Sequence, residues 1–184
     1  QFDILHASIT SFVPELSKAN RLFNQMTSFA VKSPFQLMDI TKSAKQLLAV
    51  GEAANKIIPD LQMLSDIASG SGQRLDDLSY IYTTSITRGR VYQRELYQYA
   101  TRGIPIYQSL SEVMGVSTEK LMQMVKAGKV GFPQLNEALE NMVSAGGRFY
   151  GLSDKIAATT YALKKITWFQ AIADSGLLTY IYIL

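Results

Sequence analysis

Glycine or proline interrupts this 184-residue chain at short intervals, and the apolar residues between the interruptions recur with helical spacing. Glycine favours the left-handed position just past the end of a helix, and proline is favoured in the first helical turn. Such frequent interruption is incompatible with one long unbroken helix. We therefore predict an all-α fold, a compact array of roughly eight to ten short helices.

The stretch between residues 99 and 131 shows this punctuation most clearly. Gly103 is predicted to end one helix, and Pro105 to open the next. Gly115 is predicted to end that second helix, and a serine-capped third helix should run to Gly128. Helices of about ten residues are not stable alone in water, so these three should hold their shape only by packing on each other.

Residues 2–30 carry apolar residues at alternating spacings of three and four, which is a heptad pattern. The apolar face is broad, because Val13, Leu22 and Phe29 flank the heptad positions, and Pro14 removes a backbone donor. This pattern favours two amphipathic helices, broken near Pro14, that pack on the rest of the domain. The alternative is the end of an oligomerising rod that enters from upstream.

Further helices are expected on both sides of the central stretch. Ser33 is predicted to cap, and Pro34 to open, a helix that ends at Gly51, and the next helix should begin at Pro59. Residues 69–72, Ser-Gly-Ser-Gly, are predicted to form a loop. They lack the preceding strand and the Gly-Lys-Ser of a phosphate-binding loop, so a nucleotide site is not expected there.

A helix is predicted from about Val91 to Arg102, and another from Pro133 to Gly146. The sequence Gly-Arg-Phe-Tyr-Gly follows at residues 147–151 and places two aromatic residues between glycines. A turn with such glycines allows the aromatics to cover one end of the core.

We divide the chain into lead-in helices over residues 1–32, a main domain over residues 33–160, and a trailing helix with an apolar end over residues 161–184. Residues 177–184 carry no charge and are rich in β-formers, so they are expected to pack against other residues or to continue into further sequence. The lead-in helices and this apolar end offer more apolar surface than one domain should cover. Self-association is therefore predicted, chiefly through residues 1–30.

Composition excludes several kinds of site. The chain has no cysteine, which excludes disulfides, cysteine-ligated zinc and thiol catalysis. His6 is the single histidine and is expected to be a partly exposed helical residue, not a metal ligand. No apolar run approaches the roughly 20 residues of a membrane span, and no signal peptide is visible. Because the chain begins with Gln1, it is expected to be a fragment of a longer protein.

A set of punctuating residues spread over residues 33–160 carries a family resemblance. The set is Pro34, Phe35, Gly51, Gly103, Ile104, Pro105, Gly115, Gly128, Gly146, Gly147, Phe149 and Tyr150. In order and spacing these residues resemble the tape-measure domain of phage tail-length tape-measure proteins. The part of the chain before residue 33 and the part after about residue 160 fit the family less well.

The resemblance implies a structural module of a phage or prophage tail protein, without enzymatic activity or a cofactor. It implies roles in tail assembly, tail-length determination and DNA ejection. The implied partners are tail tube and tail assembly proteins and further copies of the same chain. The implied location is the virion, after assembly in the cytoplasm of the bacterial host. Because glycine and proline are so frequent, the chain is expected to be a folded module beside the long helical ruler.

Residues 80–107 hold six of the ten tyrosines together with four arginines. Aromatics interleaved with arginines can stack bases and hold phosphates, which would suit a nucleic-acid-binding module. The same composition is typical of a protein interface, and this interpretation is favoured. DNA contact is expected to be weak because the net charge is only +3. The residues predicted for an interface are Arg88, Arg90, Arg94 and Tyr97.

Three groups of carboxylates suggest an enzyme, such as a peptidoglycan hydrolase, as a further alternative. Acid–base catalysis needs two carboxylates in different environments around a cleft. The predicted helices place all three groups at helix starts or on polar faces, so we interpret them as caps and solvated side chains. The groups are Asp76 with Asp77, Glu112 with Glu119, and Glu137 with Glu140.

Overall fold

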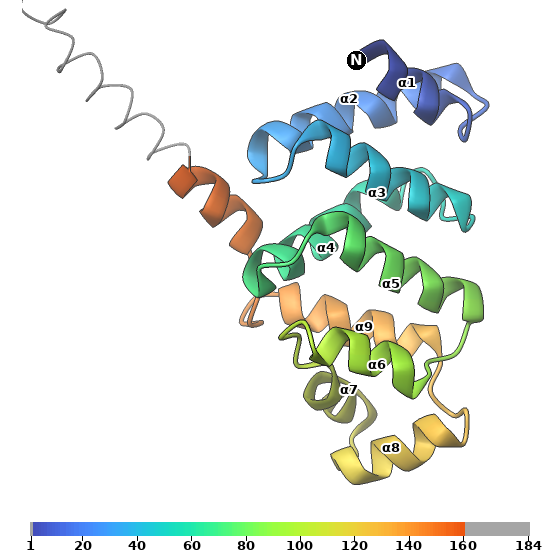
Figure 1. Cartoon of the computed structure of the whole chain (residues 1–184), viewed down its shortest axis with the longest axis vertical. Helices are drawn as coiled ribbons and strands as arrows, with labels where there is room; N and C mark the ends of the chain where they lie inside the picture. Colours follow the sequence, from blue (N-terminus) through green and yellow to red (C-terminus); the bar gives the residue numbers. More distant parts are fainter. Residues whose placement is uncertain (1, 161–184) are drawn as a thin grey trace, which may run out of the picture.

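A computed structural model describes residues 2–160 of the chain (Figure 1). These residues contain nine labelled helices and a further helical segment over residues 152–160. Within this part of the chain the only β-structure is an isolated bridge between Arg90 and Gly131. The predicted all-α array of short helices is confirmed. The labelled helices are α1 (Phe2–Thr10), α2 (Leu16–Lys32), α3 (Leu37–Ala49), α4 (Ile57–Ser71), α5 (Leu75–Arg88), α6 (Gln93–Ala100), α7 (Ile106–Met114), α8 (Thr118–Lys126) and α9 (Phe132–Val143).

The helices stack in two layers along the long axis of the molecule (Figure 1). In one layer α1 contacts α3, α3 contacts α5, and α5 contacts α6. In the other layer α2 contacts α4, α4 contacts α9, and α9 contacts α7. Helix α8 packs on α6 and α7 at the lower end of the stack in Figure 1. Because α9 lies between α4 and α7, segments far apart in the sequence form the middle of the second layer.

One buried apolar cluster connects the two layers. It includes Ile9 of α1, Phe23 of α2, Leu64 of α4 and Phe149 after α9. Helices α1 and α2 therefore share their core with the later helices. The division of the chain at residue 32 stays a prediction.

The break predicted near Pro14 is present. Helix α1 ends at Thr10 and α2 begins at Leu16. The broad apolar face of α2 packs into the array, and its buried residues are Ala19, Leu22, Phe23, Met26 and Phe29. The prediction of two amphipathic helices that pack on the domain is confirmed.

The glycines of the central stretch have the backbone conformation that was predicted for them. The φ angles are 78° at Gly103, 62° at Gly115 and 68° at Gly128, all in the left-handed region. Ser117 caps α8, because its side chain accepts a hydrogen bond from the backbone N–H of Lys120 over 3.2 Å. These local signals were sufficient to place the ends of α7 and α8.

The helix predicted to open at Pro34 begins three residues later, at Leu37. Ser33 does not cap it but follows the end of α2 in an extended conformation. A residue that precedes proline is displaced from the helical region by a clash with the proline ring, which explains the extended Ser33. Pro59 likewise does not start α4, which begins at Ile57.

The loop predicted at residues 69–72 is wrong, because α4 continues to Ser71 and only Gly72 is left-handed, with φ of 67°. Gly70 is a helical residue here. A Cβ atom on Gly70 would lie 2.3 Å from Cδ1 of Phe149 and 2.6 Å from Cδ1 of Leu152. Glycine at this position therefore allows residues 149–152 to pack closely on α4, and does not mark the end of a helix.

The helix predicted over residues 91–102 is shorter in the structure and spans Gln93–Ala100 as α6. Val91 is drawn into backbone pairing with a distant segment instead. The N–H of Val91 donates to the carbonyl of Val130 over 2.9 Å, and the N–H of Phe132 donates to the carbonyl of Gly89 over 3.1 Å. These hydrogen bonds join chain positions about 40 residues apart, so the local sequence around Val91 gave no indication of them.

Residues 152–160 are helical. The predictions for residues 161–184 fall outside the described residues. Among residues 2–160, no helix combines the length and the apolar character that crossing a membrane requires.

Candidate functional site

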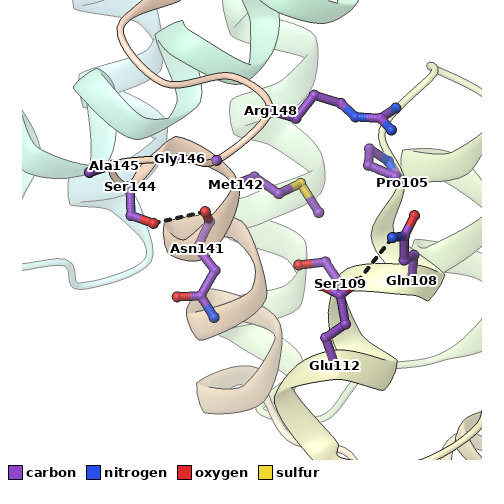
Figure 2. Close-up of a pocket in the computed structure, with 11 residues that line it drawn as sticks. Pro105, Gln108, Ser109, Glu112, Asn141, Met142, Ser144, Ala145, Gly146 and Arg148 are labelled. Atoms are coloured by element: carbon purple, nitrogen blue, oxygen red, sulfur yellow. Dashed lines mark hydrogen bonds between the residues drawn. The ribbon is translucent and has the colours of Figure 1, made fainter.

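Two predicted motif segments, separated by about 40 residues, meet around one pocket between α7 and the turn that follows α9 (Figure 2). Pro105 comes from the first segment, and Gly146 and Gly147 come from the second. The pocket has a volume of about 390 Å³. Its other lining residues are Gln108, Ser109, Glu112, Asn141, Met142, Ser144, Ala145 and Arg148.

The turn after α9 folds tightly onto the end of that helix. Gly147 has no room for a side chain, because a Cβ atom would lie 2.4 Å from the carbonyl oxygens of both Asn141 and Met142. The N–H of Phe149 donates to the carbonyl of Met142 over 2.8 Å, which satisfies a carbonyl at the end of the helix. Gly146 has φ of 87°, a conformation that favours glycine.

Helix α7 supplies the opposite wall of the pocket. Pro105 occupies the position just before its first residue, and the helical period then places Gln108, Ser109 and Glu112 on one side. Figure 2 shows the side chain of Met142 pointing into the space between the walls, and Arg148 reaching over toward Pro105.

Polar groups line both walls of the pocket. The Gln108 amide donates to Glu112 over 3.0 Å, and the guanidinium of Arg148 lies at the other rim. The hydroxyl of Ser109 donates to the carbonyl of Ala138 over 2.8 Å, and that of Ser144 donates to the carbonyl of Asn141 over 2.9 Å. Both hydroxyls therefore hold the walls of the pocket in place.

The other predicted motif residues lie elsewhere. Phe35 and Gly51 lie in the connections before and after α3, and Gly115 and Gly128 end α7 and α8. Ile104 is buried in the core near the pocket. The structure therefore brings only part of the motif set to one place.

The two aromatics between glycines have different environments, which corrects the prediction that both cover the core. Phe149 is buried against α4 at Gly70. Tyr150 is 52% exposed and lines a groove between α4 and α9, with the Lys155 ammonium 5.9 Å from its ring centroid. Helical periodicity could not separate them, because they lie in a turn.

The four predicted interface residues divide into two pairs. Arg88 forms an ion pair with Glu95, whose side chain is only 2% exposed, and the second Glu95 oxygen accepts from the N–H of Tyr92 over 3.0 Å. The guanidinium of Arg90 lies 4.4 Å from the ring centroid of Tyr92, and that of Arg88 lies 5.4 Å from it. Arg88 therefore ties the end of α5 to α6, and Arg90 packs on Tyr92 within the connection between the two helices.

Arg94 and Tyr97 form the second pair. Both project from α6 and are exposed, Tyr97 to 65% of its surface. They remain available for contact with a partner. Tyr82 and Tyr99, from the same tyrosine-rich stretch, belong to the core, and the Tyr82 hydroxyl donates to Asn136 over 2.7 Å.

The interpretation of the carboxylates as solvated holds for Glu112, Glu119, Glu137 and Glu140, which are exposed. Asp76 and Asp77 lie in the first turn of α5, as interpreted, but the Asp76 side chain is only 5% exposed. Asp76 accepts hydrogen bonds from Arg74 over 2.9 Å and 3.0 Å and also pairs with Lys42 of α3. Chiefly the Arg74 guanidinium, with help from Lys42, holds the pKa of Asp76 well below its ordinary value.

Two carboxylates that the sequence interpretation did not consider lie on α4. Burial, with the nearby Glu52 carboxylate, raises the pKa of Asp60 to about 7. Its Oδ2 atom is buried and has no hydrogen-bond partner among the described residues. Burial also raises the pKa of Asp66, which accepts a hydrogen bond from the N–H of Ser153 over 2.9 Å. The sequence did offer a signal that Asp66 is buried, because this aspartate lies between Leu64 and Ile67 in an apolar helix.

His6 is a partly exposed helical residue, as predicted. Its Nε2 atom lies 2.7 Å from the Asn20 side-chain oxygen, and its ring packs edge-on against Phe23 at a centroid distance of 5.0 Å. Within residues 2–160, no group of three or more histidine, aspartate or glutamate side chains is placed to hold a metal ion.

The model of a family described as tape measure protein matches residues 1–175. The match includes the N-terminal helices and residues beyond 160, which by their pattern had fitted less well. No curated protein and no solved structure matches the chain.

Proposed function

The chain belongs to the tape measure protein family, and we propose that residues 2–160 act as a folded docking module, not as the extended segment that measures the tail. Membership makes the chain a structural component of a phage tail. The proposal concerns what this part of the protein does there.

The observation that carries the proposal is the position of α9 between α4 and α7. A molecular ruler must gain length in proportion to its number of residues, and one unbroken helix of this chain would span about 276 Å at 1.5 Å per residue. The longest labelled helix is α2 with 17 residues, and the helices fold back on one another around a shared core. Such a folded stack therefore gains much less length per residue than one unbroken helix does.

The proposed partners are tail tube and tail assembly proteins, which the module would meet during assembly in the host cytoplasm and retain in the virion. The pocket between α7 and α9 offers polar groups for a chain segment of such a partner. The exposed pair Arg94 and Tyr97 on α6 offers a second contact surface. Tail-length determination and DNA ejection would then belong to the assembled tail, to which the module contributes contacts.

An insertion in the full-length tail protein tests the proposal. A helical (EAAAK)n insert of about 40 residues, placed in the exposed turn at Asn55, would lengthen a ruler by about 60 Å. We expect tails of unchanged length in electron micrographs, because the insert leaves the helical stack intact. Tails longer by about 60 Å would overturn the proposal. The same insert after Leu64, inside α4, is the control and should prevent assembly by breaking the core.

A further inference from the structure

Two grooves of different character border the exposed side of α4. One lies between α2 and α4, and the other lies between α4, α9 and residues 150–154. Pro59 lines both grooves, and so does Gln62. The grooves therefore lie side by side on one face of the molecule, formed by the layer α2–α4–α9.

The groove between α2 and α4 is apolar at its base and basic at its rim. Phe29 and Ile58 contribute apolar surface, and Lys18, Arg21 and Lys32 are the charged residues among its described lining. Lys18 pairs with Glu15 over 2.7 Å. Arg21 and Lys32 form no ion pair with any residue in 2–160. The rim thus presents two cations without an ion-pair partner in the described part of the chain, although the Glu15 carboxylate is close enough to Arg21 to interact with it electrostatically.

The second groove carries the opposite charge. The exposed carboxylates Glu140 and Asp154 carry this charge, and Asp60 and Asp66, whose pKa values are raised by burial, also line the groove. Its described lining contains no lysine or arginine. Its volume is about 480 Å³. Asp60 lines this groove, and its Oδ2 atom is buried without a partner among the described residues.

We propose that this face binds the same face of a second copy of the chain, related by a two-fold axis that runs along α4. A rotation of 180° about such an axis places α2 of one copy opposite α9 of its partner. Each basic rim then meets an acidic groove, and the contact occurs twice. The two α4 helices meet through Ile58, Pro59 and Gln62. A two-fold axis in the same plane but perpendicular to α4 would instead oppose like charges.

The size of the face sets the expected strength. Three helices about 10 Å apart and about 20 Å long present roughly 600 Å² per copy, somewhat less than the roughly 800 Å² per partner of a standard stable interface. The dimer should therefore form at micromolar concentrations and weaken as salt rises. This inference concerns solution association and does not depend on the proposed role as a docking module.

A charge exchange on the full chain tests the contact. The first variant, Arg21→Glu with Lys32→Glu, makes the basic rim acidic. The second variant, Glu140→Lys with Asp154→Lys, makes the acidic groove basic. All four side chains are exposed, so folding should be retained. In sedimentation experiments at low salt, each variant alone should associate at least tenfold more weakly than the unmodified chain.

An equimolar mixture of the two variants should recover the association, because both pairs of facing surfaces are then complementary in the mixed dimer. A control variant, Glu137→Lys with Lys120→Glu, exchanges exposed charges outside both grooves without changing the net charge and should associate like the unmodified chain. The inference is overturned if either groove variant alone associates like the unmodified chain, or if the mixture does not recover. It is also overturned if the unmodified chain stays monomeric at high concentration.

Discussion

At the scale of single residues, Gly70 and Asp60 show how a side chain, or its absence, is determined by contacts with distant parts of the chain. Gly70 sits inside α4 because Phe149 occupies the space of a Cβ atom. Asp60 sits in the first turn of the same helix with a buried oxygen that lacks a partner among the described residues. Each residue leads to a measurable prediction.

Gly70→Ala should destabilise the protein. Replacing a helical glycine by alanine normally stabilises by about 0.5 to 1 kcal/mol, but here the added methyl would lie 2.3 Å from a buried ring carbon. We expect a net loss of about 1 to 3 kcal/mol in urea unfolding, the usual cost of overpacking. Ser69→Ala is the control, because the Ser69 hydroxyl is buried without a described partner and its removal should cost little. A stabilised Gly70→Ala variant would contradict the packing.

Asp60 should make stability depend on pH near neutrality. Its pKa is raised from 3.8 to about 7 in the folded state, so the protonated form favours folding. This contribution is fully present below pH 3.8 and is lost as pH rises through about 7. Asp60→Asn should therefore stabilise the protein by about 1 to 2 kcal/mol at pH 8, a figure reduced for partial exposure, and should change it little at pH 4.

The measurement is urea unfolding of both proteins between pH 4 and pH 8. Glu137→Gln, at an exposed position on α9, should show the same pH dependence as the unmodified chain. An Asp60→Asn difference that does not grow with pH would show that Asp60 is not the titrating group.

At the scale of helices, buried carboxylates join one helix to another, both between distant helices and between consecutive ones. Asp76 at the start of α5 pairs with Lys42 of α3, and these two helices are neighbours in one layer. Glu95 of α6 pairs with Arg88 at the end of α5. The pairs fix how one helix follows or crosses the next, whereas the apolar core provides most of the packing.

Arg88→Ala should destabilise the junction of α5 and α6 by about 1 to 2 kcal/mol, because it leaves a buried carboxylate without its cation, and Arg88 itself is partly exposed. Arg94→Ala, only six residues later but exposed, should change stability by less than about 0.5 kcal/mol. Thermal or urea unfolding of the two variants gives the comparison. Adding Glu95→Gln to Arg88→Ala should reduce the loss of stability, because the buried carboxylate is then removed. Equal losses of stability in Arg88→Ala and Arg94→Ala would contradict the importance of the Arg88–Glu95 pair.

At the scale of the whole molecule, the two layers separate the basic residues instead of gathering them. Arg88 and Arg90 are held against Glu95 and Tyr92, whereas Arg21 and Lys32 lie on α2 in the other layer. Strong binding to DNA needs several cations that reach phosphates at once.

We therefore expect DNA binding weaker than about 10 μM near physiological salt, measured by fluorescence anisotropy with a labelled duplex. A control titration at low salt should show tighter, sequence-independent binding. Sub-micromolar binding at physiological salt that disappears with Arg90→Ala and Arg94→Ala would instead favour a nucleic-acid-binding module.

The sequence by itself determined the fold class and most helix ends. Gly103, Gly115 and Gly128 have positive φ angles, and this preference belongs to the glycine backbone regardless of its surroundings. The break near Pro14 and the apolar face of α2 follow from equally local rules. Where a helix end depended on such a rule alone, the prediction was correct or wrong by a few residues.

Only the tertiary structure decided which residues meet. The pairing of Val91 with Val130, the burial of Asp60, Asp66 and Asp76, and the helical Gly70 all depend on contacts between segments distant in sequence. The insertion of α9 between α4 and α7 produces the pocket and one of the two grooves on α4. Periodicity shows which face of a helix is apolar, but it carries no information on which other helix covers that face.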